Sequence, residues 1–345
     1  MAEGTKGDKY FDYITKKILD KGCRDERPRP HYEDFYEGAK YDYTHHIIEE
    51  SNGNIIKLAG EQYAYQTESG ILLNTPAYTL SLNGELFKYD LASGESPLIT
   101  KRPIAVKSSV DEMLWIYQKE SNDLVEFDEM LGKNTWDIDG KINNWWKDWP
   151  IRNPDGSYNL NEKGHPHIGH CYGATVLDHK LMKTLIDGIR KDPFGRRHII
   201  CLWQVEDFND PHGLKPCAFM TIWSVRRGRD GVYYLDMSLI QRSSDFMTAG
   251  CINQYQYVAL QTCIAKYLGY KPGEFNWFVH NIQIYDRHIE GAEEMLRREP
   301  IDCNPKIIVA DKDFYDLTRD DIKLVDYPLE KIKKKNPQIK FQIAI

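Results

Sequence analysis

Cys217 is the residue of this chain best suited to act as a nucleophile. It lies in the run Gly213-Leu-Lys-Pro-Cys-Ala-Phe-Met-Thr, after a proline and at the expected start of a strand. A thiolate is a strong nucleophile, and a neighbouring cation such as Arg242 would lower the pKa of the thiol and favour that form. A cysteine by itself is more often a small buried hydrophobe. We keep that simpler interpretation for the cysteines in apolar surroundings, which are Cys201, Cys251 and Cys263.

Arginines in the same half of the chain could bind an anion. Arg242 and Ser243 lie at the end of an expected strand, within Gln241-Arg-Ser-Ser-Asp245. Arg196 and Arg197 are adjacent and follow a Pro-Phe-Gly turn. Two neighbouring guanidinium groups can hold a phosphate through forked hydrogen bonds. The alternative is that Arg196 and Arg197 are solvated surface charges.

Asn253 begins an apolar helix, where an asparagine is often a helix cap. A second interpretation is recognition of a pyrimidine. The amide offers one donor and one acceptor side, which match O4 and N3–H of uracil, and the rotated amide would match cytosine. The residue type therefore indicates a pyrimidine edge more firmly than it indicates uracil.

Three more polar residues could take part in chemistry. Glu112 stands beside large apolar residues, and burial would raise its pKa and suit it to relaying protons. The alternative is a carboxylate on a helix surface. Gln283 and Tyr285 are two residues apart on an expected strand, so they share a face and could bind a ribose hydroxyl. For these two the alternative is ordinary strand polarity.

The elements that must position these residues are a mixture of helices and strands. The spacing of apolar residues predicts helices at 10–21, 108–118, 179–191, 251–268 and 286–298. It predicts hairpins between 41 and 89, and strands at 198–205, 218–225, 232–241, 275–284, 306–309 and 338–345. Residues 138–168, which contain several tryptophans, are expected to be an ordered loop. We therefore predict an α+β fold with one extended sheet, in a single domain spanning 1–345.

Composition and charge exclude several classes of protein. A chain of 345 residues with 41% hydrophobic content can bury a large core. The formal net charge of −7 argues against general nucleic-acid binding, which requires a basic surface. The seven cysteines include no Cys-x-x-Cys pair, so neither a metal site nor a disulfide framework is expected. The N-terminus is polar and no apolar run is long enough to span a membrane, so we expect a cytoplasmic protein.

Taken together and in their order, the motifs resemble the folate-dependent thymidylate synthase family, from about residue 76 to the end. Glu112 lies in the matching run Asp-Glu-Met-Leu-Trp-Ile-Tyr-Gln. The other matching runs are Asn134-Thr-Trp-Asp137, Gly169-His-Cys-Tyr-Gly173, Asp192-Pro-Phe-Gly-Arg-Arg197, Leu214-Lys-Pro-Cys217, Gln241-Arg-Ser-Ser-Asp245, Asn253 and Ile284-Tyr-Asp-Arg-His288. Each run alone is modest, and all of them in order are highly specific.

The resemblance implies a role for each matching residue. Cys217 resembles the nucleophile that adds to C6 of dUMP, and Glu112 resembles the carboxylate that organises proton transfer through water. The other catalytic residues implied are Tyr172, Asp245 and Asn253. The dUMP ligands implied are Arg29, Arg196, Arg197, Gln241, Arg242, Ser243, Asn253, Gln283 and Tyr285, although Arg27 competes with Arg29 for its match. The folate ligands implied are Trp136, Asp245 and Ile345, the last in a C-terminal segment that closes over the folate.

The resemblance also implies an architecture and partners. It implies a large mixed sheet, flanked by helices, that forms the interface of a homodimer in which Arg196 and Arg197 reach the partner's phosphate. The co-substrate implied is 5,10-methylenetetrahydrofolate, and neither a metal nor nucleic acid is required. Two segments near 35–73 and 138–167 are expected to be insertions.

Some positions depart from the family pattern. Gln283 stands where a histidine is usual, two residues before the ribose-binding tyrosine. Ala218 follows the nucleophile, where relatives often carry a histidine. The run before Asn253 is Thr248-Ala-Gly-Cys-Ile, where the family usually carries a Gly and a Pro-Phe, so the local backbone there is an open question.

Two alternative functions stay open. A pyrimidine nucleotide hydroxymethylase of the same fold would add water, rather than hydride, to the intermediate. Asn253 favours uracil over cytosine, because relatives specific for cytosine tend to carry an aspartate there. A catalytically idle member of the fold that binds its own mRNA is the third hypothesis. The acidic charge and the combined presence of Cys217, Glu112 and Arg242 argue against it.

Overall fold

The computed structural model describes residues 2–25, 40–42, 47–49, 55–57, 62–67, 70–76, 78–133, 136–153, 155–209 and 215–341. Two of the expected ligands, Arg29 and Ile345, lie outside the described residues, as do Asn134, Thr135 and Leu214.

A six-stranded mixed sheet forms the centre of the molecule. Its strand order is β1-β7-β11-β10-β9-β8, in which β10 and β11 are parallel and the other neighbours are antiparallel. The strands are β1 (Cys23–Asp25), β7 (Thr79–Asp90), β8 (His198–Cys201), β9 (Ala218–Arg227), β10 (Tyr233–Asp245) and β11 (Lys271–Tyr285). Cys217, Asp245 and Tyr285 lie at or next to strand ends, so the sheet positions much of the expected site.

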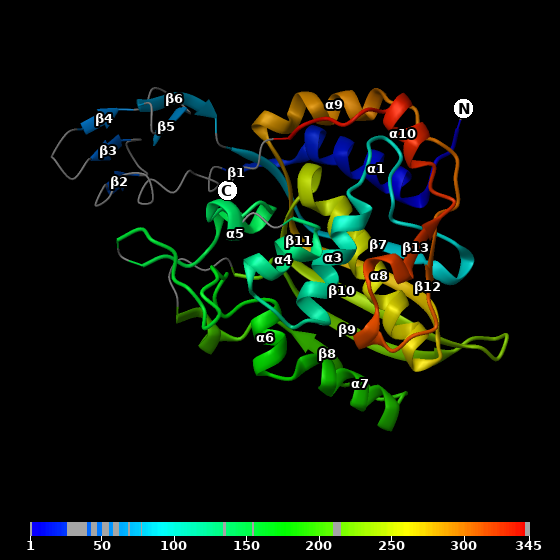
Figure 1. Cartoon of the computed structure of the whole chain (residues 1–345). Helices are drawn as coiled ribbons and strands as arrows, with labels where there is room; N and C mark the ends of the chain where they lie inside the picture. Colours follow the sequence, from blue (N-terminus) through cyan, green and yellow to red (C-terminus); the bar gives the residue numbers. More distant parts are fainter. Residues whose placement is uncertain are drawn as a thin grey trace.

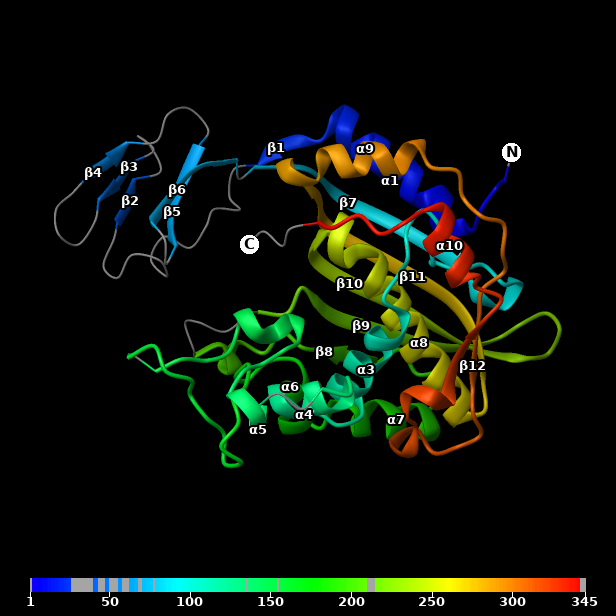
Figure 2. The same cartoon turned by 45° about the horizontal axis from the view of Figure 1, so that its top comes forward.

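Helices pack on one side of this sheet, with α8 across its middle strands, α1 and α9 near β7, and α7 near β8 (Figures 1 and 2). The helices are α1 (Lys6–Lys21), α3 (Val106–Tyr117), α4 (Leu124–Met130), α5 (Trp136–Asp139), α6 (Gly173–Asp178), α7 (Leu181–Lys191), α8 (Cys251–Leu268), α9 (Ile289–Arg297) and α10 (Leu329–Lys335). Helix α8 is buried on almost all sides, as expected of a helix that is apolar all round. The predicted α+β fold, with a mixed sheet flanked by helices, is confirmed.

The opposite face of the sheet is apolar and partly exposed. On β10, Leu235, Met237 and Leu239 are buried, as expected when alternate residues face the helices. On the other face Ile222 pairs with Ile199, and both are exposed. Leu86, on β7, is exposed as well and lies on the same face by its register with β11. A sheet face of this kind usually requires a covering partner.

Short strands form three smaller sheets. Between β1 and β7, β2 (Lys40–Asp42), β3 (Ile47–Glu49) and β4 (Ile55–Lys57) pair antiparallel, and β5 (Gln62–Thr67) pairs with β6 (Gly70–Pro76). The prediction of hairpins in this region is confirmed. Near the C-terminus, β12 (Lys306–Val309) pairs with β13 (Ile322–Val325).

Most predicted elements are present, and the errors lie at their ends. Helix α8 has the predicted bounds. The predicted helix at 179–191 begins only at Leu181, because Lys180 adopts a left-handed conformation with φ 51° and separates α6 from α7. The strand predicted at 198–205 ends at Cys201. The strand predicted at 338–345 is wrong for residues 338–341, which are irregular and pair with no described strand despite their alternating apolar pattern.

Candidate active site

Cys217 lies in a half-buried position directly before β9, where the backbone of β10 holds it. Gln241 pairs with Ala218, and the Arg242 N–H donates to the Cys217 carbonyl oxygen at 2.9 Å. The Cys217 N–H donates to the Tyr172 hydroxyl at 3.1 Å, and the Ser243 hydroxyl lies 3.7 Å from the sulfur and can donate to it. The thiol is therefore accessible and has a polar neighbour, unlike a packed hydrophobe.

The other cysteines of the apolar interior differ from Cys217. Cys251 and Cys263 are buried, and desolvation raises the pKa of their thiols to about 11 and about 12. These two remain protonated at neutral pH, in agreement with their interpretation as small hydrophobes. Cys201 is only partly buried.

Arg242 contacts the loop that carries the nucleophile. Its guanidinium group donates to the carbonyl oxygens of Lys215 at 2.8 Å and Pro216 at 3.0 Å. The group also lies over the Trp203 ring, 5.8 Å from its centroid. In this structure Arg242 holds the backbone before Cys217, and its expected contact with a phosphate is an additional role that stays a prediction.

Tyr172 is held by a strained backbone. It caps α6 with φ 49° and ψ −109°, a conformation that non-glycine residues rarely adopt and that tends to occur at functional sites. The next residue, Gly173, cannot be replaced by a residue with a side chain, because a Cβ atom there would lie 2.0 Å from the Ser121 carbonyl oxygen. Burial raises the pKa of Tyr172 well above its ordinary value, so its hydroxyl stays neutral and acts through hydrogen bonds.

Glu112, in α3, is a buried carboxylate surrounded by donors. Its Oε1 accepts from the indole N–H groups of Trp145 at 2.7 Å and Trp146 at 2.6 Å, and its Oε2 accepts from the Gln256 side chain. Burial raises the pKa of Glu112, and these hydrogen bonds oppose the rise by favouring the ionised form. The expectation of a buried carboxylate is confirmed, and a carboxylate with a raised pKa in such surroundings is suited to proton transfer.

Asn253 lies in the first turn of α8 but does not act as a helix cap; Gly250 stands at that position. Its Oδ1 accepts from the Gln241 side chain at 3.2 Å, and its Nδ2 donates to the Gln256 side chain at 3.3 Å. Because Gln256 also binds Glu112, Asn253 and the Glu112 carboxylate belong to one hydrogen-bonded network.

The end of β10 brings Asp245 close to the expected sugar-binding residues. Asp245 accepts from the Met247 N–H, the Thr248 N–H and the Thr248 hydroxyl, and so caps the short π-helical turn Phe246–Gly250. Gln283 pairs with Asp245 on the neighbouring parallel strand, and Tyr285 follows on the same face of β11. The backbone before Asn253, left open by the sequence, is this turn, and it continues directly into α8.

Three other predicted residues do not join this group. Arg196 and Arg197 are exposed in the turn between α7 and β8, and within the part of the chain that the structure describes neither has a polar partner. Such free cations are available to an external anion. Trp136 contacts Tyr158, with ring centroids 5.8 Å apart.

Sequence reasoning missed four residues of the site. Trp145 and Trp146 lie in the ordered loop and reach Glu112, Gln256 joins Glu112 to Asn253, and Trp277 donates to Gln241 at 2.9 Å. Tryptophan enrichment was the available signal for the loop residues. For Gln256 the sequence contains no distinct signal, because Gln254 and Gln261 are also polar residues of the same helix.

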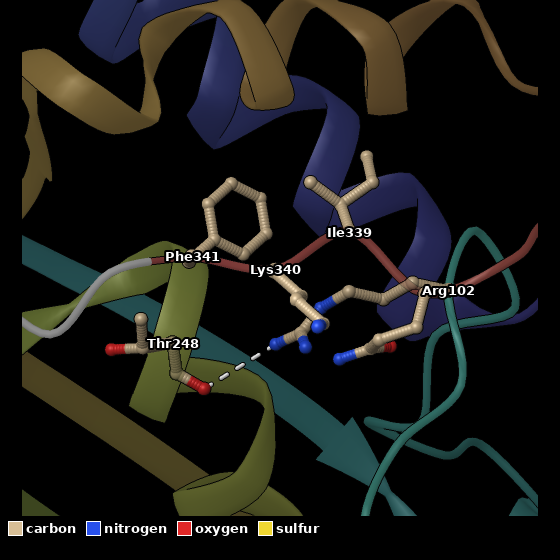
Figure 3. Close-up of a pocket in the computed structure, with 6 residues that line it drawn as sticks. Arg102, Thr248, Ile339, Lys340 and Phe341 are labelled. Carbon is tan, nitrogen blue, oxygen red and sulfur yellow. Dashed lines mark hydrogen bonds between the residues drawn. The ribbon is translucent and has the colours of Figure 1, made fainter.

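A pocket of about 390 Å³ lies next to Asp245 rather than at Cys217. Its lining residues are Arg102, Thr248, Gln338, Ile339, Lys340 and Phe341. Figure 3 shows the C-terminal segment Ile339–Phe341 passing Arg102, whose guanidinium group donates to the Met247 and Thr248 carbonyl oxygens at 2.7 and 3.3 Å. The C-terminal segment therefore forms one wall of a pocket whose other side is the turn that Asp245 caps.

The described residues contain neither a cluster suited to a metal ion nor a helix suited to a membrane. No group of three or more His, Cys, Asp or Glu side chains there could hold a metal ion. No helix there is long and apolar enough to cross a membrane.

Comparison with known proteins supports the resemblance seen in the motifs. Residues 62–345 match the family described as thymidylate synthase. Curated proteins named thymidylate synthase from Streptococcus sanguinis and Lactococcus lactis are each 37% identical to this chain, with 99% of this chain and 100% of theirs aligned. The solved structure of thermostable thymidylate synthase A from Bacillus subtilis has the same fold, with a TM-score of 0.69 and 27% identity over 98% of this chain and 99% of that one. The chain belongs to the thymidylate synthase family.

Proposed function

We propose that this protein catalyses the reductive methylation of dUMP to dTMP, with 5,10-methylenetetrahydrofolate as the donor of carbon and hydride. One observation of the structure carries the proposal. Cys217 lies at a strand start beside Ser243 and Tyr172, and the same strands lead through Gln241 to Asn253 and on to Glu112. These contacts support a site in which a nucleophile, a pyrimidine-binding amide and a buried acid–base group act together.

Cys217 supplies the covalent step. C5 of uracil is a poor nucleophile, and addition of the Cys217 thiolate at C6 makes C5 an enolate carbon. The Ser243 hydroxyl, 3.7 Å from the sulfur, can donate a hydrogen bond to the thiolate. Arg242 holds the preceding backbone and keeps the sulfur at the strand start.

Asn253 and Glu112 stabilise charge and move protons. An N–H of Asn253 can donate to O4 of uracil, where negative charge develops when sulfur adds at C6. Glu112 lies beyond Gln256, buried and held by two indoles, so it can exchange protons with O4 and C5 through water. Tyr172, which stays neutral, orients the Cys217 backbone and can bind the water that receives the C5 proton.

Folate would supply the one-carbon unit and the hydride when bound. The pocket of about 390 Å³ beside Asp245 has Arg102 and Lys340 in its lining, and these cations suit an anionic co-substrate. Asp245, Trp136 and the C-terminal Ile345 are the proposed folate ligands. Closure of the C-terminal segment would exclude water from the intermediate.

We also propose that the active form is a homodimer built on the exposed face of the main sheet. Ile199, Ile222 and Leu86 give that face its apolar character. Arg196 and Arg197 precede β8 at the edge of the sheet and are free to reach the phosphate in the partner's site. A C2 interface would give each site the same pair of arginines.

The first test of the function is a product assay. The full chain should convert dUMP and methylenetetrahydrofolate to dTMP and dihydrofolate, detected by mass and absorbance. The Cys217→Ser variant should lose turnover by at least about 10³-fold while still binding dUMP. Cys303→Ser, at a half-buried cysteine outside the site, is the matched control and should stay active. Full activity of Cys217→Ser would refute the mechanism.

The same assay distinguishes the alternatives. A hydroxymethylated nucleotide without dihydrofolate would support a hydroxymethylase, which the comparisons do not favour because the relatives are named thymidylate synthases. Absence of turnover and of a covalent adduct between Cys217 and 5-fluoro-dUMP would support a binding protein.

Mixing two inactive variants tests the shared site. Cys217→Ser and a double Arg196→Ala, Arg197→Ala variant should each be inactive as homodimers. After subunit exchange, the heterodimers contain one complete site, and mixing should restore up to roughly a quarter of the wild-type activity. No recovery in samples where exchange is verified would mean that each subunit uses its own arginines.

A further inference from the structure

An unbroken series of hydrogen bonds runs from Trp277 to Glu112 through three side-chain amides, which we call the amide chain: Gln241, Asn253 and Gln256. The Trp277 indole N–H donates to Gln241 Oε1 at 2.9 Å, and Gln241 Nε2 donates to Asn253 Oδ1 at 3.2 Å. Asn253 Nδ2 donates to Gln256 Oε1 at 3.3 Å, and Gln256 Nε2 donates to Glu112 Oε2. Every amide in the chain therefore donates in the same direction.

The Trp277 end fixes that direction. An indole N–H can only donate, so the Gln241 oxygen must face Trp277 and its NH₂ group must face Asn253. Asn253 must then present its oxygen to Gln241, and its NH₂ group is left for the Gln256 oxygen. Because Trp277 is fully buried, no water molecule can replace its indole N–H as the donor to Gln241.

The Glu112 end requires the same direction. Trp145 and Trp146 both donate to Oε1, which makes that oxygen an acceptor. The ionised form of Glu112 accepts at its second oxygen too, and in that form Gln256 presents its NH₂ group to Glu112 and its oxygen to Asn253. Both ends thus hold Asn253 in one of its two possible rotations.

This arrangement leaves Asn253 with one unused N–H and one unused lone pair. An N–H that can reach O4, beside an oxygen that can accept from N3–H, matches uracil, whereas cytosine needs the rotated amide. Rotation would place the Asn253 NH₂ group against the NH₂ group of Gln241, and its oxygen against the oxygen of Gln256. The hydrogen-bonding groups of a freely rotating amide do not choose between uracil and cytosine; the amide chain does.

We propose that Gln256 is a positioning residue that selects uracil over cytosine, by joining Asn253 to Glu112 and locking the rotation of the Asn253 amide. This inference rests on the proposed function, because it concerns the nucleotide of that same site. Gln256 acts through Asn253 and contacts neither the nucleotide nor the folate in this role.

Another buried glutamine of α8 shows what a purely structural amide looks like. Gln261 donates to the carbonyl oxygens of Leu235 at 2.8 Å and Glu274 at 3.0 Å, and so binds only backbone. Gln256 instead binds two side chains that the proposed mechanism uses, which is why its substitution should change specificity and not only stability.

The experiment measures dissociation constants for dUMP and dCMP by calorimetry on the full chain without folate. In Gln256→Met the preference for dUMP over dCMP should fall by roughly 3- to 10-fold, the contribution of about one hydrogen bond, since Gln241 still holds the other side of Asn253. Gln261→Met should be less stable but should keep the wild-type preference. An unchanged preference in folded Gln256→Met would overturn the proposal.

Gln256→Glu separates the contact of residue 256 with Asn253 from its contact with Glu112. It is also the variant to measure if Gln256→Met does not fold. A glutamate still offers an oxygen to Asn253 but places a second carboxyl group beside Glu112. The preference for dUMP should therefore be kept, while kcat falls and its pH profile changes. Loss of the preference in Gln256→Glu would contradict the assigned role.

The wild-type protein distinguishes failure of this inference from failure of the function. If the wild type binds dUMP and makes dTMP but Gln256→Met keeps full discrimination, only the inference fails. If the wild type binds neither nucleotide, the proposed function fails, and the inference with it.

Discussion

Asp8 in α1 and Glu112 in α3 are both buried carboxylates whose pKa is raised by desolvation, yet their surroundings differ. Asp8 accepts from the Thr5 N–H at 3.1 Å and from the N–H and hydroxyl of Thr100 at 2.7 and 2.8 Å. With Thr5 it forms a capping box and joins the start of α1 to a neighbouring segment of chain. All of these contacts serve local backbone structure.

Glu112 has no such local role. Its donors come from a loop and from α8, and through Gln256 it leads to Asn253, which has hydrogen-bonding capacity left over. A raised pKa therefore does not by itself identify a functional carboxylate. A functional carboxylate differs from a structural one in its hydrogen-bond partners. Those of Asp8 only hold backbone segments together, whereas those of Glu112 lead to a side chain that can still bind a ligand.

Glu112→Gln tests the functional member of this pair and should have the largest effect. The substitution keeps the shape but removes the group that exchanges protons, so the rate of dTMP formation should fall by about 10² to 10⁴-fold. The free energy of unfolding should change by no more than about 2 kcal/mol, since both indole donors keep their acceptor and only the hydrogen bond from Gln256 is lost. Steady-state kinetics and urea unfolding of the same preparation measure both effects. Activity within tenfold of wild type would show that Glu112 is structural.

Asp8→Ala tests the structural member. Three hydrogen bonds, from the Thr5 N–H and from the N–H and hydroxyl of Thr100, lose their acceptor, so the free energy of unfolding should fall by about 2–4 kcal/mol. The kcat of the folded enzyme, measured well below its unfolding temperature, should remain close to that of wild type. Asp8→Asn keeps one acceptor oxygen and should lose less stability. A large loss of kcat in a folded Asp8→Ala enzyme would remove the contrast between the two carboxylates.

The pH dependence of stability gives the smallest effect and applies to both groups. The folded-state pKa of each carboxylate is raised above its ordinary value, 3.8 for Asp8 and 4.5 for Glu112. The folded protein therefore binds these protons more tightly than the unfolded chain does. The stability that results from this tighter binding is fully present below the ordinary pKa values and is lost as pH rises through the folded-state pKa values.

Difference measurements isolate this contribution from the other carboxylates. Glu112→Gln and Asp8→Asn do not titrate at these positions, so their stability relative to wild type should increase as pH rises from about 4.5 toward neutral. Urea unfolding of wild type and variants at a series of pH values measures the change. A difference that stays constant with pH, or decreases, would contradict the raised pKa values.

The sequence predicted the main elements of the fold where their patterns are long. Helix α8 was predicted with its observed bounds because 18 residues give a continuous apolar signal between clear ends. Short elements such as α4 and α10, with seven residues each, were missed because they contain too few turns to show a period. The C-terminal strand was wrong because an alternating pattern does not supply a pairing partner.

Prediction of the site likewise succeeded for residues that a sequence pattern marks and failed for residues that it does not mark. The motifs named Cys217, Glu112, Asp245 and Asn253, because residue type and spacing mark them along the chain. Trp145, Trp146 and Gln256 were not named, since their importance arises from contacts with Glu112, which is 33, 34 and 144 residues away in sequence. No local pattern can report such contacts.

The amino-acid sequence by itself determined the family and the α+β class and predicted the nucleophile, because these depend on residue types in a fixed order. Only the tertiary structure decided which way the Asn253 amide points. The covalent chain allows both rotations, and the choice is made by Trp277 and Glu112, donor and acceptor groups that folding brings to the two ends of the amide chain.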